Sequence, residues 1–234
     1  MSLTSFKLEC VALTSLFISV CCYAEELKPL SVSGISESIY LVGSRTNPSD
    51  LGGFYKSDNM PKGIEIDKLG APNTLSLVVL PDQQVPYRPH QQGPMFRGFQ
   101  LMVVNRTGKE VTFRAQDSRV NIIREAQTPE GVWKPIELMS PSFCGNSYHR
   151  VFLPDKHCWT FAAPVFAGSL KTKMRFLLVV SELTDVTYSN EFDGFINPAQ
   201  WTVAKPEPPP EDPPKLRLSP PLDPELKKRL EQLR

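Results

Sequence analysis

Short apolar runs that alternate with polar residues fill the stretch 99–180, and they limit the fold more than any other feature of the chain. Successive side chains of a β-strand point to opposite faces, so such runs are typical of strands with one buried face. Turn residues separate the runs about every 8 to 12 residues, which indicates an all-β sandwich or barrel and not an α/β fold. The predicted strands are 99–104, 111–115, 120–126, 132–138, 148–153, 158–162 and 172–180.

Residues 25–98 carry weaker strand patterns, separated by a long loop rich in small and polar residues. Residues 81–98 contain four prolines. Because proline cannot donate a hydrogen bond to a sheet ladder, this stretch is not expected to form a central strand, and it is interpreted as a second long loop or a flexible connection. We expect residues 25–98 to be an N-terminal elaboration that packs on, or leads into, a sandwich core at 99–203. The strands expected in the elaboration are 35–42, 64–67 and 74–80.

The first 24 residues have the pattern of a secretory signal peptide. Lys7 gives a short basic region, and residues 10–22 form an apolar run of the length that such peptides use. Small residues at Cys22 and Ala24 then provide a cleavage site. A membrane-spanning helix needs about 20 apolar residues, so this run is too short to cross a bilayer. We expect residues 1–24 to be removed and the mature chain, without a transmembrane segment, to be periplasmic, on the cell surface or extracellular.

Cleavage there would leave two of the five cysteines, Cys144 and Cys158. In an oxidising compartment two remaining cysteines most simply pair, and a loop of this length would stabilise the fold by about 3 kcal/mol in the chain-entropy model. Two free buried thiols are one alternative. The other is a metal site that includes His149 and His157, although their spacing does not match the paired ligands of zinc fingers. We predict the disulfide, with no metal and no cofactor.

Beyond the sandwich the composition changes to proline and charged residues. Residues 204–224 hold nine of the 23 prolines, which predicts an extended polyproline-II spacer that forms no core. Asp223 and Pro224 then begin a short amphipathic helix at 225–234. Because so short a helix is marginal in isolation, a partner surface is expected to hold it. Its apolar face consists of Leu226, Leu230 and Leu233.

A basic stripe is the first candidate for binding. Lys171, Lys173 and Arg175 alternate with Thr, Met and Phe, so a strand would place the three charges on one face and the mostly apolar side chains on the other. This stripe would bind an anionic polymer or an acidic protein. Alternatively, it is the solvated face of an outer strand, where lysines discourage edge pairing.

The three tryptophans also admit two interpretations. Trp133 lies in a cleanly alternating run and is expected in the core, as is common for a tryptophan in a β-sandwich. Exposed aromatic side chains would instead make a platform for stacking sugars. That role stays open for Trp159 and Trp201.

Residues suited to catalysis are present, but no spacing assigns them. Several serines lie near histidine in the sequence, yet none stands in a Gly-x-Ser-x-Gly turn. Residues 190–194 offer oxygen ligands for calcium without the spacing of a known loop. We therefore assign no catalytic residue and no metal ligand, and a site assembled from distant residues stays open. The formal net charge of +1 argues against nucleic-acid binding.

The run at 103–113 resembles the strand-turn-strand that recurs in bacterial immunoglobulin-like domains, and the segments 131–133 and 153–155 add to the likeness. The pattern is also similar to that of the small β-sandwich proteinase inhibitors of bacteria. The resemblance covers about residues 99–180 and implies an immunoglobulin-like antiparallel β-sandwich. Fold alone does not fix function.

We expect a non-enzymatic binding module that acts on a protein or an envelope polymer. One alternative is an envelope hydrolase whose site is assembled in three dimensions. The other is a β-sandwich proteinase inhibitor, for which the segment between Cys144 and Cys158 is the candidate loop.

Overall fold

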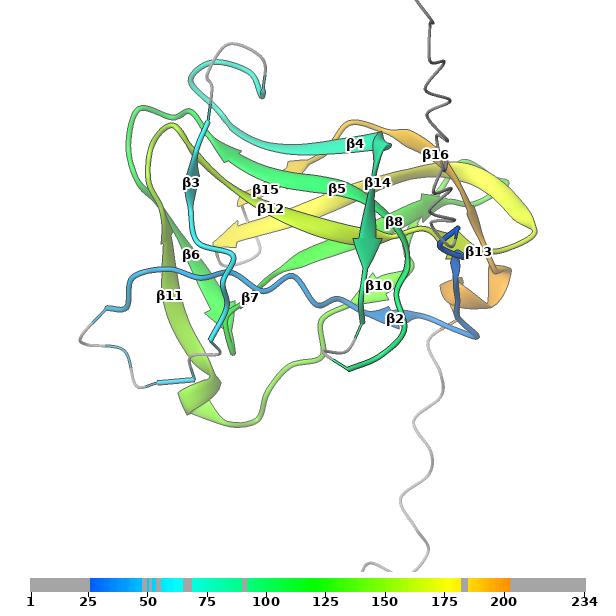
Figure 1. The fold of residues 1–234 in the computed structure, drawn as a ribbon, viewed down its shortest axis with the longest axis horizontal. Coiled ribbons are helices and arrows are strands. Elements are labelled where there is room, and N and C mark those ends of the chain that lie inside the picture. Colours follow the sequence, from blue (N-terminus) through cyan, green and yellow to red (C-terminus); the bar gives the residue numbers. More distant parts are fainter. Residues whose placement is uncertain are drawn as a thin grey trace, which may run out of the picture.

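The computed structural model of the chain describes residues 26–47, 50, 52–53, 56–64, 69–89, 92–181 and 185–202. In these residues it contains β-strands and two short 3-10 helices, and no α-helix (Figure 1). The all-β prediction is therefore confirmed, and the long strands pair antiparallel. The elements are β1 (Leu30–Ser31), β2 (Ser36–Glu37), β3 (Lys62–Gly63), β4 (Leu75–Tyr87), β5 (Phe96–Asn105), β6 (Val111–Gln116), β7 (Arg119–Val120), β8 (Ile122–Gln127), β9 (Trp133–Pro135), β10 (Glu137–Leu138), η2 (Gly145–Ser147), β11 (Tyr148–Leu153), β12 (His157–Pro164), β13 (Phe166–Ala167), β14 (Leu170–Ser181), β15 (Asp185–Tyr188), β16 (Phe192–Ile196) and η3 (Pro198–Trp201).

One layer is a sheet with the strand order β3-β12-β5-β4. Its central strand β5 is buried on both faces: Leu101 and Val103 point into the main core, whereas Met102 and Val104 point into a second, smaller cluster. Leu101 lies opposite Phe161 of β12 in the antiparallel register. A strand with both faces covered has a continuous apolar sequence, which is why this segment is the clearest strand signal in the chain.

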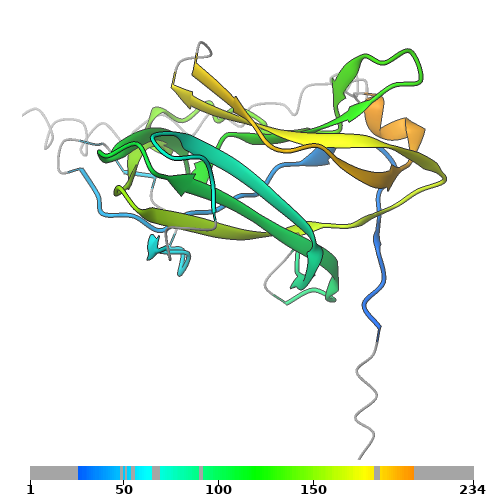
Figure 2. The ribbon, with the colours of Figure 1, turned by 90° about the horizontal axis from the view of Figure 1, so that it is seen from above.

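The other layer is built around β14, which pairs with β8, β15 and β16, while β9 extends it beyond β8. The sheet β11-β6-β7 adjoins this layer, because only Asn121 separates β7 from β8. The carbonyl of Asn121 accepts a hydrogen bond from the Val179 N–H of β14 at 2.9 Å. Figure 2 shows the two layers lying face to face.

Aromatic side chains from both layers meet in the main core. Phe99 of β5 lies edge-on to Phe192 of β16 and to Phe176 of β14, with ring centroids 5.1 and 6.2 Å apart. Trp159 of β12 packs against Phe113 of β6 at 5.2 Å. Each such pair contributes about 0.5–1.5 kcal/mol beyond its buried area, so these contacts fix how the layers sit on each other.

β4 runs through Pro81 and Pro86, so the prediction of a loop or connection over 81–98 is wrong for residues 81–87 and 96–98, while the connection between β4 and β5 begins after Tyr87. β4 is the edge strand of its sheet, where a proline can leave its outer side without a ladder hydrogen bond. The register with β5 shifts between Leu80 and Gln84, as expected of a β-bulge. The prolines therefore exclude this segment from the centre of a sheet but allow it to form an edge strand.

The cysteine pairing predicted from the sequence is also wrong: Cys144 and Cys158 are both free thiols. Cys158 lies on β12, buried in the small cluster with Met102 and Val104, whereas Cys144 is exposed beyond the far end of β11. β11 alone separates them by about 17 Å at roughly 3.3 Å per residue. A disulfide needs Cα atoms about 4.4–6.8 Å apart, so the two cannot bond in this fold.

The N-terminal segment lies along both layers. Tyr40 and Val42 are buried in the main core, β1 pairs with β13, and β2 pairs with β10. Of the strand expected at 35–42, only β2 is assigned as strand. Further along, the Val42 N–H donates a hydrogen bond to the Ser118 carbonyl. Residues 65–67 of the short strand predicted at 64–67 lie outside the described residues.

Several further predictions fall outside the described residues. These are the signal peptide at 1–24, the proline-rich spacer at 204–224 and the helix at 225–234 with Leu226, Leu230 and Leu233. Within the residues that are described, no helix has the length and apolar character needed to span a membrane.

Candidate binding face on the outer side of β14

The basic stripe lies on β14 as the alternation predicts. Lys171, Lys173 and Arg175 point away from the core, whereas Met174 and Phe176 point into it. Outward side chains of β8, β9 and β15 lie beside the stripe. We call this surface the outer face; it consists of Ile123, Glu125, Trp133, Arg175, Leu177, Val179, Val186 and Tyr188, with Lys171, Lys173 and Asp193 at one end.

The two lysines at the end of the outer face share one carboxylate. Lys173 Nζ lies 2.8 Å and Lys171 Nζ 3.7 Å from the carboxylate oxygens of Asp193 on β16. The hydrogen bond from Lys173 lowers the pKa of Asp193, and the same contact raises the pKa of Lys173. The carboxylate of Glu191 also acts on Lys173, so two positive and two negative charges meet at this end of the face.

Arg175 is held in the middle of the outer face by three groups. Its guanidinium carbon lies 4.3 Å from the ring centre of Trp133 and 4.0 Å from that of Tyr188. Its Nε donates to Glu125 Oε2 at 2.8 Å. Such cation–π contacts contribute about 0.5–1 kcal/mol each at exposed sites, so the side chain is fixed in one orientation before any partner binds.

Trp133 belongs to the outer face, and its predicted place in the core is wrong. In the register of β9 with β8, Trp133 lies opposite Gln127, which points outward together with Glu125. β9 is the last strand of its sheet. The ring is therefore half-buried, against Arg175 instead of the core.

Aliphatic and aromatic side chains extend the outer face beyond Arg175. Leu177 lies opposite Ile123 of β8 on one side and Tyr188 of β15 on the other, and Val179 lies opposite Val186. Tyr188 is 48% exposed and Val186 is 40% exposed. Exposed apolar side chains grouped around a fixed arginine are typical of a protein-interaction surface.

The other two tryptophans do not lie on this face. Trp159 is fully buried, and its Nε1 donates to the Gly43 carbonyl at 3.1 Å, so its indole does not reach a surface ligand. Trp201 lies at the end of η3 and packs, partly buried, against the main core. Of the three tryptophans, Trp133 is the one suited to surface contact, although the sequence pattern predicts it in the core.

A loop at 139–147 presents the most exposed apolar side chain of the described residues, Phe143. The neighbouring Ser142 is held on both backbone groups: its N–H donates to Gln116 Oε1 at 3.2 Å, and its carbonyl accepts from the Tyr148 hydroxyl at 3.1 Å. Gln116 also donates to the Ser140 carbonyl at 2.9 Å. The loop backbone is thus fixed next to a fully exposed phenylalanine.

The side chains of His149 and Ser118 lie next to each other. His149 Nε2 lies 3.4 Å from Ser118 Oγ, and His149 Nδ1 lies 3.3 Å from the Ser147 carbonyl. Both side chains are buried, and burial lowers the pKa of His149. Ser118 follows Asp117 in the tight turn between β6 and β7, where both residues have positive φ.

This Ser–His contact is longer than that of an activated nucleophile. The distance exceeds the 2.6–3.2 Å typical of a nucleophile and its base. His149 borders a hollow of about 560 Å³, whereas Ser118 borders a different hollow of about 300 Å³.

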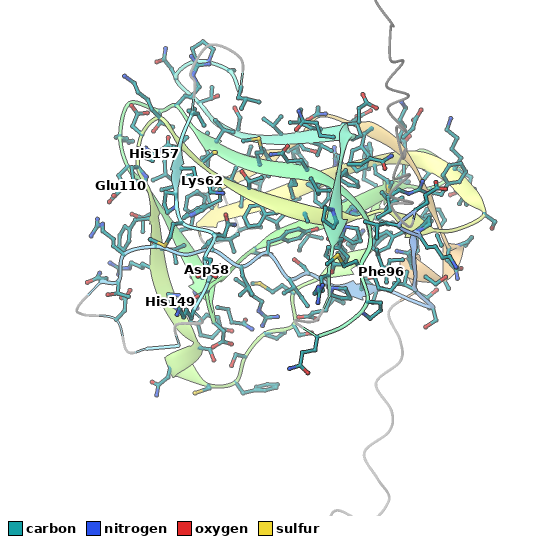
Figure 3. All side chains as sticks on the ribbon, viewed as in Figure 1. Asp58, Lys62, Phe96, Glu110, His149 and His157 are labelled. Carbon is teal, nitrogen blue, oxygen red and sulfur yellow. The ribbon has the colours of Figure 1, made fainter. Side chains whose placement is uncertain are left out.

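Metal binding at the histidines finds no support from their positions. Figure 3 shows His149 and His157 at opposite ends of β11. In the part of the chain that the structure describes, no three His, Cys, Asp or Glu side chains are grouped to hold a metal ion. Asn190, at the start of the segment considered for calcium, instead binds both backbone groups of Val79 on β4.

A buried ionic cluster was missed by sequence reasoning. Arg124 of β8 and Glu137 of β10 lie 3.2 Å apart inside the core, and the Tyr40 hydroxyl donates to Glu137 at 2.9 Å. Burial raises the pKa of Glu137, an effect that the Arg124 charge opposes. Arg124 alternates with the inward-pointing Ile122 and Ala126, so the strand period would have placed it in the core.

The comparisons with known proteins give no relative. The chain matches no protein-family model, no curated protein and no solved structure.

Proposed function

We propose that the protein is a non-enzymatic binding module that holds a protein partner on the outer face. The observation that carries this proposal is Arg175, fixed between the rings of Trp133 and Tyr188. Tryptophan, tyrosine and arginine are the residues that most often dominate binding energy at interfaces. Because these three side chains already hold one another, little further side-chain entropy is lost when a partner binds.

The groups on the outer face indicate the chemistry of a partner. Arg175 and Glu125 pair in its middle, and the lysines at its end face two carboxylates, those of Asp193 and Glu191. A complementary partner would place apolar side chains over Leu177 and charged groups of both signs around them. A protein fits this description better than an uncharged sugar polymer.

We also propose that the two layers form an immunoglobulin-like sandwich. The antiparallel pairing of the long strands and a tryptophan, Trp159, in the core between the layers support this assignment. The free thiols of Cys144 and Cys158 depart from the disulfide-linked form of that fold. Export of the mature chain to the envelope or beyond remains part of the proposal, and N-terminal sequencing of the protein from fractionated cells would test it.

Site-specific photo-crosslinking tests the binding proposal. A photoreactive phenylalanine analogue at Leu177 is expected to give one discrete protein adduct in the native extract, because it replaces a central side chain of the outer face. The same analogue at Thr112, an exposed position of β6, is the matched control. The proposal fails if Leu177 gives no adduct, or if both positions give the same adducts.

A second candidate function, proteinase inhibition, is favoured by the loop at 139–147. Inhibitory loops present one specificity side chain on a fixed backbone, and Phe143 beside the doubly held Ser142 has that form. The target would be a protease with an apolar specificity pocket. Inhibition of a chymotrypsin-like protease that is lost in Phe143→Ala would support it, whereas simple cleavage after Phe143 would exclude it.

A further inference from the structure

A cavity of about 390 Å³ lies between the two layers. Its rim consists of exposed residues, among them Gln84 in the bulge of β4 and Phe195 of β16. Its floor consists of buried side chains, among them Arg124, which is fully buried. The cavity therefore lies against a buried cation, and it meets the outer face only at Lys171 and Asp193.

The guanidinium of Arg124 has hydrogen-bonding capacity to spare. Its Nη1 donates to the Pro164 carbonyl at 2.7 Å, and its Nη2 lies 3.2 Å from Glu137 Oε1. Its Nε has no hydrogen-bond partner among the described residues, and neither does the buried Nε of Arg97, which also lines the cavity. Buried polar groups are almost always satisfied in proteins, so two unsatisfied arginine nitrogens at one cavity indicate a missing acceptor.

The charges around the cavity favour an anion. Arg97, Arg124 and Lys171 line it, and the acidic groups near them are already engaged. Asp193 at the rim holds Lys173 and Lys171, and Glu137 behind the floor holds Arg124 and accepts from Tyr40. Guanidinium groups bind carboxylates through directed, charge-assisted hydrogen bonds, so a carboxylate is the natural acceptor.

The walls of the cavity favour an apolar body on that anion. Phe99, Phe166, Phe192 and Met174 contribute buried surface to it. Arg124 lies 4.4 Å from the ring centre of Phe166 and 5.3 Å from that of Phe99, so the rings hold the guanidinium without using its N–H groups. An apolar lining with a few convergent polar groups is the usual form of a small-molecule site.

We propose that this cavity binds a medium-chain or single-ring monocarboxylate, with the carboxylate at Arg97 and Arg124 and the apolar body against Phe192 and Met174. A cavity of about 390 Å³ lies in the range of small-molecule sites, which suits a ligand of the size of decanoate. The proposal does not rest on the protein partner, although the cavity and the outer face share Lys171 and Asp193.

Isothermal titration of the purified full chain with decanoate and with decanol, its uncharged counterpart, tests the proposal. The wild-type protein is expected to bind decanoate saturably and at least about tenfold more tightly than decanol, because only the carboxylate satisfies the arginines. This selectivity requires no variant. Absence of saturable decanoate binding, or equal affinity for decanol, would overturn the proposal.

Two arginine variants locate the site. Arg97→Gln is expected to weaken decanoate binding by about tenfold or more and to leave the weaker binding of decanol unchanged. Arg114→Gln removes the same side chain from an exposed position on β6 and is expected to change neither. Equal losses in both variants would place the ligand elsewhere. Trp133→Ala on the outer face should not affect decanoate, which separates this site from the partner-binding proposal.

Discussion

Replacing Glu137 by alanine removes the buried counter-charge of Arg124. The two side chains lie 3.2 Å apart and are at most 3% exposed. After the substitution the guanidinium keeps the Pro164 carbonyl at 2.7 Å as its hydrogen-bond acceptor, and the Tyr40 hydroxyl loses its carboxylate. Breaking a buried pair from one side costs about 3–5 kcal/mol. In a chain of this size that loss lowers the melting temperature by roughly 6–20 °C.

Urea unfolding followed by tryptophan fluorescence at pH 7 measures this loss directly. A triple variant, Tyr40→Phe with Arg124→Met and Glu137→Leu, serves as the control because it removes both charges and the hydroxyl together. It is expected to be more stable than Glu137→Ala, since no uncompensated charge stays buried. A cost below about 1 kcal/mol for Glu137→Ala, or a triple variant less stable than the single one, would refute the reasoning.

Three further outcomes are expected. Burial lowers the pKa of His149, so the unfolded chain binds more protons at this site than the folded chain, and the free energy of unfolding falls as the pH drops below about 6.5. Urea unfolding at pH 7.5 and 5.5 measures this fall, which should be smaller in His149→Gln. In protein expressed from Glu25 onward, a thiol reagent should modify the exposed Cys144 in the native state and the buried Cys158 only after unfolding. If neither cysteine reacts in urea, the two are bonded to each other. Deletion of residues 205–234, which are rich in proline and charge, should leave the melting temperature nearly unchanged and reduce partner retention; an unfolded product would contradict this.

Strands with one buried face could be predicted from the sequence. β11 begins and ends as expected, and β14 contains the predicted 172–180, because strict alternation is imposed by a single core on one side. β8 was found as well, although Asn121 separates it from β7, a break that leaves no mark in the apolar pattern.

Other features depend on strand order, which the sequence does not reveal. Pro81 and Pro86 are compatible with a strand only because β4 lies at the edge of its sheet. Trp133 alternates as a core residue would, but the register of β9 with β8 places it opposite Gln127, on the outer face. The predicted pairing of Cys144 with Cys158 rests on their number and on an expected oxidising compartment, and it fails because β11 separates them.

The candidate site could be predicted in part. The alternation of Lys171, Lys173 and Arg175 correctly places three charges on one side of a strand. The rings on either side of Arg175 come from β9 and β15, which are far apart in the sequence, so their meeting depends on the sheet register. The inward position of Arg124 follows from the strand period. Its pairing with the carboxylate of Glu137 could not be predicted, because Glu137 lies on β10, which pairs with β2 and not with the strand of Arg124.

The most direct test of the central claim compares two variants in one assay of partner retention on the native envelope fraction. Leu177→Asp places a charge in the centre of the outer face, and Ser118→Ala removes the hydroxyl beside His149. If the protein works by binding through this face, Leu177→Asp should weaken retention by roughly thirtyfold or more, and Ser118→Ala should have no effect. Full retention by Leu177→Asp, or an equal loss of retention in Ser118→Ala, would contradict the account.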